Sequence, residues 1–165
     1  MQIEAKLQEL GLVLPEPFKT PPGLQLPFSW ARVRGNRVYI SGHGPLNPNG
    51  TLAGPFGKVG VDVSTEEAYR AARLIALAIL SSLKRELGDL DRVTAWLRVL
   101  GMVNAAPGFT RTTSVINGFS ELILELYGPE AGQHARAAIG VAELPFGIPV
   151  EIEAEVEIEI TAGSR

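Results

Sequence analysis

The chain has 165 residues, of which 45% are hydrophobic and 20% charged, and its net charge is −3. This length and composition predict one globular domain with a sizeable core. The acidic balance argues against a nucleic-acid partner, because phosphate neutralisation requires a basic surface. Disulfides, thiolate nucleophiles and zinc–thiolate sites are excluded, because the chain contains no cysteine. No apolar stretch approaches the roughly 20 residues of a membrane helix, and the N-terminus is unlike a signal peptide, so we expect a cytoplasmic protein without a membrane partner.

The N-terminal segment combines a short helix with a proline-rich arm. Ile3, Leu7 and Leu10 follow helical spacing, and Gly11 supplies a stop. Residues 14–27 contain five prolines and therefore cannot form regular structure. We expect residues 1–26 to form this helix and an extended surface arm that clasps a neighbouring subunit. Residues 27–165 then form a single α+β domain.

The middle of the chain predicts a hairpin followed by a long helix. Residues 30–42 contain two β-rich pieces around Gly35-Asn36, a pair typical of a hairpin turn. Residues 44–63 are rich in turn formers, with room for one short strand. Ser64 and Glu67 have the spacing of a capping box, so a helix is expected to begin there and to end at Gly88.

The second half predicts three strands and one more helix. Residues 91–104 carry apolar side chains on both faces, as a central strand does. A helix is expected over about 112–127, closed by Gly128-Pro129, and a strand begins in the run 134–145. After a reversal at 145–149, residues 150–160 alternate strictly between apolar residues and five glutamates, which indicates a strand with one buried face.

This order of elements predicts an α+β fold in which a mixed sheet carries two helices packed on one face. The other face of the sheet then has no cover within the chain. We expect Trp96 and Leu100 to lie on that face, where they favour contact with a second subunit.

The chemistry, if any, must come from isolated polar side chains. The chain has no glycine-rich phosphate loop before a helix, no GxSxG elbow and no HExxH motif. Each remaining candidate also has a structural interpretation. His43 is interpreted as an exposed turn residue, Arg136 as the partner of a surface glutamate, and Glu151 as one more solvated glutamate. The candidates are Ser41, His43, Asn117, His134, Arg136 and Glu151.

Three stretches of the chain, over about residues 27–160, resemble the reactive intermediate deaminase (Rid, or YjgF-type) family. They begin "VYISGHGPLNPNG", "LGDLDRVTAWLRVLG" and "GQHARAAIGVAELP", and the last runs into "VEIEAEVEI". Members of this family are also labelled endoribonuclease L-PSP-like or translation-inhibitor-like. The resemblance implies a chorismate-mutase-like fold and a homotrimer with clefts between subunits. It also implies cofactor-free and metal-free hydrolysis of enamines and imines such as 2-aminoacrylate to 2-oxo acids and ammonia.

The resemblance assigns roles residue by residue. Arg136 falls on the family's carboxylate-binding arginine, and Glu151 on the glutamate thought to position the attacking water. Asn117 falls on the helix asparagine, and Ser41 with Gly42 on the serine–glycine pair. The catalytic set is therefore Glu151, Ser41 and Asn117, and the substrate-binding set is Arg136, Gly42 and Phe28.

Phe28 departs from the family, because active deaminases have a tyrosine at this position. Together with Ala138, His43-Gly44 and the N-terminal extension, it indicates a divergent subgroup. The missing phenol favours a second hypothesis, in which a trimeric protein binds a small carboxylate without turnover. Ribonuclease or translation-inhibitor activity is a third hypothesis, disfavoured by the acidic charge.

The predicted strand order also leads to a geometric expectation. If Arg136 begins one strand and Glu151 begins the next after a reversal, they lie roughly 25–30 Å apart along the sheet. They can then share a site only between subunits, which agrees with a homotrimer that binds a carboxylate-bearing ligand.

Overall fold

The computed structural model describes residues 1–160, and the last five residues of the expected domain lie outside this range. The elements follow the expected order, and each strand and long helix lies close to its predicted bounds. They are α1 (Gln2–Glu9), β1 (Ala31–Arg34), β2 (Arg37–His43), α2 (Thr65–Leu87), β3 (Val93–Asn104), α3 (Thr112–Ala131), β4 (Ala135–Val141) and β5 (Val150–Ile158), with short 3₁₀ turns at Leu90–Arg92 and Pro145–Gly147. Residues 46, 52, 59 and 63 of the long connection form isolated bridges in place of the short strand allowed for there.

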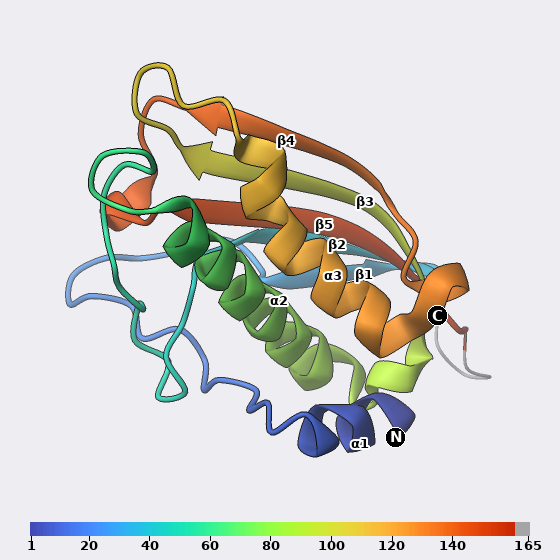
Figure 1. Ribbon diagram of the computed structural model, residues 1–165. Coiled ribbons are helices and arrows are strands. Elements are labelled where there is room, and N and C mark those ends of the chain that lie inside the picture. The colour runs from blue at the N-terminus through green and yellow to red at the C-terminus, as the bar shows by residue number, and fades with distance from the viewer. Residues whose placement is uncertain (161–165) are drawn as a thin grey trace.

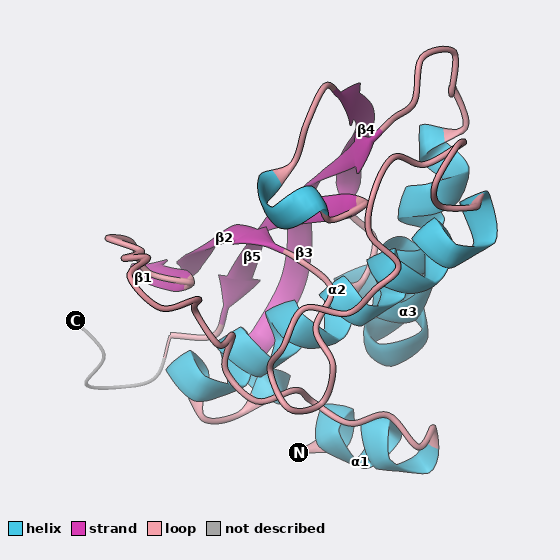
Figure 2. Ribbon diagram, turned by 90° about the vertical axis from the view of Figure 1, so that its left-hand side faces the viewer, coloured by secondary structure: helices cyan, strands magenta, loops and turns pink. Residues whose placement is uncertain are grey.

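The five strands form one mixed sheet in the order β1-β2-β5-β3-β4 (Figure 1). Only β3 and β4 run parallel, and the other neighbours are antiparallel. The two long helices, α2 and α3, cover one face, and no helix of residues 1–160 covers the other (Figure 2). The predicted class, an α+β fold with two helices packed on one face, is therefore confirmed, and α1 adds a third, short helix.

Local signals in the sequence explain the ends of the helices. The Ser64 hydroxyl accepts a hydrogen bond from the Glu67 amide, and the Glu67 side chain accepts one from the Ser64 amide, which completes the predicted capping box. Gly128 leaves the helical conformation with φ 79°, so α3 is interrupted where Gly128-Pro129 predicts its end.

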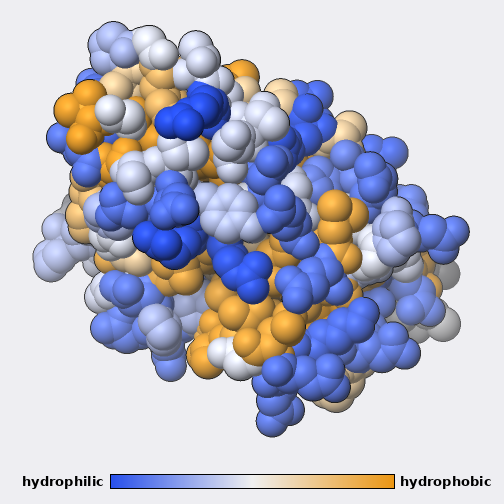
Figure 3. All heavy atoms as spheres, in the orientation of Figure 1, coloured by the Kyte–Doolittle hydropathy of each residue, from blue (hydrophilic) through white to orange (hydrophobic). Residues whose placement is uncertain are grey.

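The core lies between the sheet and the helices. The strand β5 directs Val150, Ile152, Ala154, Val156 and Ile158 into it, as the alternation predicts, whereas Ile160 is exposed beyond the strand. On the outer side of the helices, hydrophilic residues surround smaller apolar patches (Figure 3). No helix of the described residues is long and apolar enough to span a membrane.

The expectation that Trp96 lies on the open face is wrong. Trp96 is fully buried and packs against Phe119 and Tyr127, with ring centroids 5.8 and 5.7 Å away. It pairs with Val156, and the register of β3 against β5 shifts between Trp96 and Arg98. This irregularity breaks the alternation and turns Trp96 toward the helices.

The helices α2 and α3 approach closely at Gly118. A Cβ atom at this position would lie 2.1 Å from the Tyr69 carbonyl oxygen in α2. We expect Gly118→Ala to lower the free energy of unfolding by about 1–3 kcal/mol, because the backbones must move apart. Urea denaturation measures the change. Ser114→Ala, at an exposed position of the same helix, is the matched control and should leave stability unchanged or slightly raised.

Candidate active site

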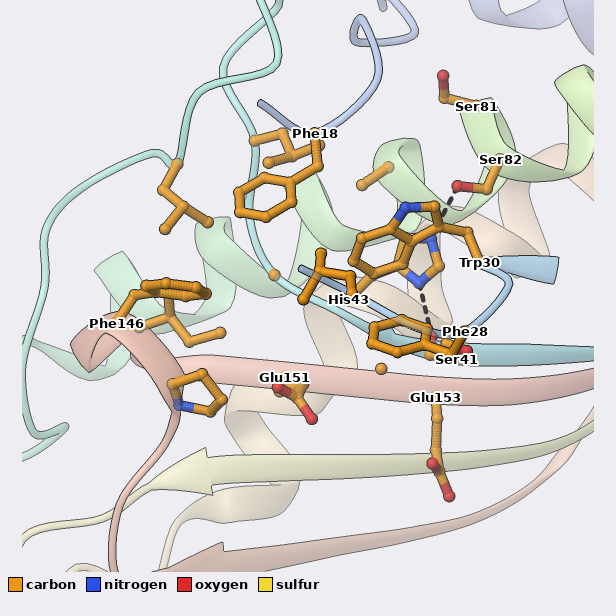
Figure 4. A pocket seen from close by; sticks show the side chains of 18 of the residues that line it. Phe18, Phe28, Trp30, Ser41, His43, Ser81, Ser82, Phe146, Glu151 and Glu153 are labelled. Carbon is orange, nitrogen blue, oxygen red and sulfur yellow. Dashed lines mark hydrogen bonds between the residues drawn. The ribbon is translucent and has the colours of Figure 1, made fainter. Parts of the chain in front are cut away.

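A cavity of about 620 Å³ opens beside the end of β2 (Figure 4). The start of β5, the 3₁₀ turn at Pro145–Gly147, the C-terminal half of α2, the loop after β2 and the proline-rich arm complete its wall. Phe28, Ser41, Gly42 and Glu151 all line it. Four of the six residues that the family resemblance singles out therefore meet within one chain.

A β-bulge builds the polar end of this cavity. Ile40 pairs with Ala154 and His43 pairs with Ile152, so Ser41 and Gly42 together lie opposite the single residue Glu153. The extra residue lets both Ile40 and His43 face the helices although they are three positions apart. Such bulges often re-aim side chains next to functional sites.

Glu151 lies directly over Gly42. A Cβ atom on residue 42 would come within 2.5 Å of the Glu151 carboxylate, so a glycine leaves the space that this side chain occupies. Burial raises the pKa of Glu151, and the neighbouring charge of Glu153 raises it further. With a raised pKa, the protonated and ionised forms of the carboxyl group are both populated at a pH closer to neutral, as a general acid or base requires.

His43 is buried, with 4% of its surface exposed, and is not the exposed turn residue expected from the sequence. Its ring packs against Trp30 at a centroid distance of 4.9 Å, with the two ring planes tilted by 57°. Nδ1 lies 2.6 Å from the Ser41 carbonyl oxygen, and Nε2 lies 2.8 Å from the Ser82 hydroxyl (Figure 4). Because both ring nitrogens have partners, His43 holds the bulge against α2 and presents no free nitrogen to the cavity.

The partners of His43 fix its tautomer. A backbone carbonyl only accepts, so Nδ1 carries the proton and the Ser82 hydroxyl donates to Nε2. Arg85 donates to both Ser81 and Ser82, at 2.6 and 3.0 Å, and Ser81 donates in turn to the Pro15 carbonyl oxygen at 2.6 Å. Burial lowers the pKa of His43 to about 4, although the hydrogen bond that Nδ1 donates to the Ser41 carbonyl oxygen raises it, and the charge of Arg85 lowers it further. The ring is therefore neutral at pH 7.

The other two predicted residues lie together elsewhere. Arg136 donates from Nη1 to the Asn117 side-chain oxygen at 2.9 Å and to the Ser120 hydroxyl at 3.0 Å. Ser120 also lies 2.8 Å from Nε2 of His134, whose Nδ1 faces the Gly132 carbonyl oxygen at 2.7 Å. An arginine, a serine and a histidine are thus linked in the same order as Arg85, Ser82 and His43. Within the chain Arg136 pairs with helix side chains, and no ion pair with a surface glutamate is found among residues 1–160.

The expected separation of Arg136 and Glu151 is corrected by the strand order. The strands β4 and β5 are not neighbours but flank β3, where Arg136 pairs with Val99 and Glu151 with Met102. Three residues along β3 and two strand spacings place their Cα atoms about 14 Å apart. Val99 is buried under the helices, and Met102 lies an odd number of residues away, on the open face. Within one chain the two side chains point to opposite faces of the sheet. The sheet lies between them, and the distance along the strands is not what separates them.

Several cavity residues had no signal in the sequence. Phe18, Leu24 and Leu26 come from the arm, which lies along its own chain. The amides of Glu16 and Lys19 donate to the carbonyl oxygens of Pro48 and Gly50, at 2.9 and 3.0 Å. Proline content predicts that this segment is extended, but not the surface on which it lies.

One cluster of carboxylates has the proximity of a metal site. Oxygen atoms of Glu4, Asp89 and Asp91 lie within 4.8 Å of one another. Asp91 accepts hydrogen bonds from the first amides of α1 and pairs with the N-terminal ammonium group, and Glu4 pairs with Lys84 at 2.7 Å. Capping of α1 and ion pairing account for this cluster.

The sheet, the two long helices on one of its faces and the acid-bearing cavity at the bulge define a chorismate-mutase-like α+β protein. The chain belongs to the YjgF family: the model described as "YjgF/chorismate_mutase-like, putative endoribonuclease" matches residues 4–148. The Rid/YjgF resemblance predicted from the sequence is therefore confirmed.

Three relatives are similar over nearly the whole chain. Protein TCP17 of Trypanosoma cruzi is 39% identical, covering 95% of this chain and 94% of its own. The crystal structure of Atu1372 from Agrobacterium tumefaciens, described as of unknown function, is 40% identical with a TM-score of 0.84 and covers 96% and 93%. A Shewanella oneidensis protein described as a "putative endoribonuclease" is 28% identical with a TM-score of 0.85 and covers 96% and 100%. The similarity to Atu1372 agrees with a divergent subgroup.

Proposed function

We propose that the protein hydrolyses reactive imines and enamines of the 2-aminoacrylate type to 2-oxo acids and ammonia, at clefts between the subunits of a homotrimer. An enamine first tautomerises to the imine. Water then adds to the imine carbon, the nitrogen takes up a proton, and ammonia leaves as the carbonyl forms. This reaction consumes one water molecule and involves no change of oxidation state.

The observation that supports this proposal most strongly is the placement of Glu151. Its carboxyl group is half-buried in the cavity, directly beside Ser41 and Gly42, and its pKa is raised. The ionised form accepts a proton from the attacking water, and the protonated form donates one to the imine nitrogen. The Ser41 hydroxyl donates to the Ser29 carbonyl oxygen at 2.7 Å, so its lone pairs remain available to a bound water or ammonium group.

The open face of the sheet supports the trimer. Paired residues across three strands form two rows there, Ala137–Leu100–Glu153 and Ile139–Met102–Glu151. Ile139 is exposed, and Leu100 and Met102 are partly exposed. A second subunit that packs on this face would bury these apolar side chains and bring a carboxylate-binding Arg136 toward the cavity. Arg136 is accessible to a neighbour because β4 is an edge strand.

Arg136→Ala tests both the proposed hydrolysis and the role of Arg136 in binding the substrate carboxylate. With 2-aminoacrylate generated in situ, wild-type protein should speed pyruvate release, and Arg136→Ala should lower kcat/KM by about 10²-fold, since a charge-assisted bidentate contact is lost. Asn117→Ala, which removes one partner of the guanidinium, should cost less. If wild type and Arg136→Ala both match the reaction without protein, the enzyme proposal is wrong.

The oligomeric state is a separate test. Analytical ultracentrifugation at micromolar concentration should show a species of three chains, and Leu100→Glu should dissociate it by placing an unpaired charge in the interface. Thr94→Glu, at an exposed position of the same strand, is the matched control and should remain trimeric. A single-chain species for the wild type would contradict the shared cleft.

Phe28 favours a second candidate function, a trimeric protein that binds a small carboxylate without turnover. Phe28 is 51% exposed beside the cavity and packs on Trp30 at 5.2 Å, but it has no hydroxyl with which to hold a water or a substrate. Binding of pyruvate without any acceleration of imine hydrolysis would support this function. RNA cleavage that survives Arg136→Ala would support neither candidate.

A further inference from the structure

The cavity beside Glu151 is far larger than a 2-aminoacrylate molecule requires. Its volume of about 620 Å³ lies within the range of about 300–1,000 Å³ that is typical of sites for drug-sized ligands. A substrate with three carbon atoms would leave most of it empty or filled with water.

The part of the cavity away from Glu151 is apolar and largely aromatic. Phe18 lies 6.0 Å from Trp30 and 6.0 Å from Phe146, so the three rings form a continuous wall. The remaining apolar lining consists of Leu24, Leu26, Leu46, Leu52, Pro145 and Ile148, with Phe28 and Ala78. Such a surface favours binding of a branched or aromatic group, because binding removes the apolar area of that group from water.

The polar atoms behind this wall already have partners. His43 uses both ring nitrogens, and the hydroxyls of Ser81 and Ser82 each accept from Arg85 and donate to another group. An apolar side chain that enters the cavity therefore leaves none of these groups unpaired. A polar side chain would find them all occupied and would lose its own hydration.

The arm is a fixed part of this wall. Three hydrogen bonds to main-chain atoms of the arm hold it: the amides of Glu16 and Lys19 donate to carbonyl oxygens, and the carbonyl oxygen of Pro15 accepts from the Ser81 hydroxyl. Gly50 also lets the arm approach closely, since a Cβ atom there would lie 2.3 Å from the Pro17 carbonyl oxygen. The arm thus positions Phe18, Leu24 and Leu26 against the cavity before any ligand binds.

We propose that this cavity is the subsite for the substrate side chain, and that the arm makes the protein selective for imino acids and 2-oxo acids with branched or aromatic side chains. The assignment rests on the proposed function for the chemistry at Glu151. The carboxylate and the imine of the substrate then lie at the bulge end, and the side chain points toward Phe18 and Phe146.

Binding and turnover are measured separately on the full chain. Isothermal titration calorimetry compares 4-methyl-2-oxopentanoate with pyruvate, and we expect at least 30-fold tighter binding of the larger acid with a negative heat-capacity change. For turnover, an L-amino-acid oxidase with catalase generates imines from leucine, phenylalanine and alanine. The kcat/KM for the first two should exceed that for alanine imine by at least 30-fold.

A cavity-filling variant provides the decisive comparison. Leu26→Trp should reduce the preference for the larger side chain at least tenfold in both assays, because the indole occupies the subsite. Leu10→Trp, at an exposed position outside the cavity, is the matched control and should keep the wild-type preference. Thermal unfolding checks that both variants are folded.

The outcomes distinguish this inference from the proposed function. Selective binding of 4-methyl-2-oxopentanoate without hydrolysis of any imine would contradict the proposed enzymatic function and support the side-chain subsite. Hydrolysis of alanine imine at least as fast as leucine imine, or a Leu26→Trp preference equal to that of wild type, would overturn the subsite and keep the enzyme.

Discussion

Glu151→Gln is expected to lower kcat/KM for imine hydrolysis by about 10²–10⁴-fold, the usual contribution of a general acid or base. The amide keeps the shape of the side chain over Gly42 but cannot exchange a proton with water or with the imine nitrogen. Stopped-flow measurement of 2-oxo acid release, with the imine generated in situ, gives the change. Calorimetry should show that the product acid still binds, since the substitution leaves the cavity volume unchanged.

The neighbouring glutamates of β5 serve as controls for this prediction. Glu155→Gln, on the same face of the strand but outside the cavity lining, should retain full activity. Glu153→Gln removes the like charge that raises the pKa of Glu151, so the acidic limb of the pH–rate profile should move to lower pH. Equal loss of activity in the Glu151 and Glu155 variants would show that the carboxyl group of Glu151 has no special role.

Acid should destabilise the protein through His43. Its pKa is about 4 in the folded state and 6.5 in the unfolded reference, so the unfolded chain binds one more proton between these values. The stabilisation is therefore fully present above pH 6.5 and is lost as the pH falls toward 4. From pH 7 to pH 4.5 this residue alone should remove about 2.5 kcal/mol from the free energy of unfolding.

Urea denaturation of wild type and His43→Gln at both pH values isolates this contribution. The variant should be less stable than wild type at pH 7 and should lose about 2.5 kcal/mol less on acidification, because other groups titrate alike in both proteins. NMR titration of the His43 ring in the wild type measures the folded-state pKa directly, even if the variant unfolds. A ring pKa near 6.5 would contradict the buried, neutral histidine.

Signals confined to one segment predicted the fold well. The capping box at Ser64, the Gly35-Asn36 turn and the alternation of β5 each depend on contacts within a few residues, and all are confirmed. The bulges next to His43 and Trp96 escaped prediction because each adds one residue to a strand without any change in composition. They turn His43 and Trp96 toward the helices, whereas the sequence predicted His43 in an exposed turn and Trp96 on the open face.

The candidate site was predictable only in part, because its assembly depends on contacts between distant segments. The family resemblance assigned Ser41, Gly42, Phe28 and Glu151, and the structure brings these four together. Arg136 and Asn117 form a separate pair because β3 lies between β4 and β5, and this strand order depends on pairing between distant segments. The arm residues were missed because their packing depends on the tertiary surface beneath them.

The attachment of the arm to the domain does not depend on the arm side chains that shape the cavity. Its anchors, the amides of residues 16 and 19 and the carbonyl of residue 15, are main-chain atoms and do not depend on the side chains beside them. Exchange of residues 18, 24 or 26 would therefore leave the attachment intact while reshaping the space in front of it. The N-terminal segment is a place where ligand preference can diversify during evolution while the reactive carboxyl group, on a distant strand, stays the same.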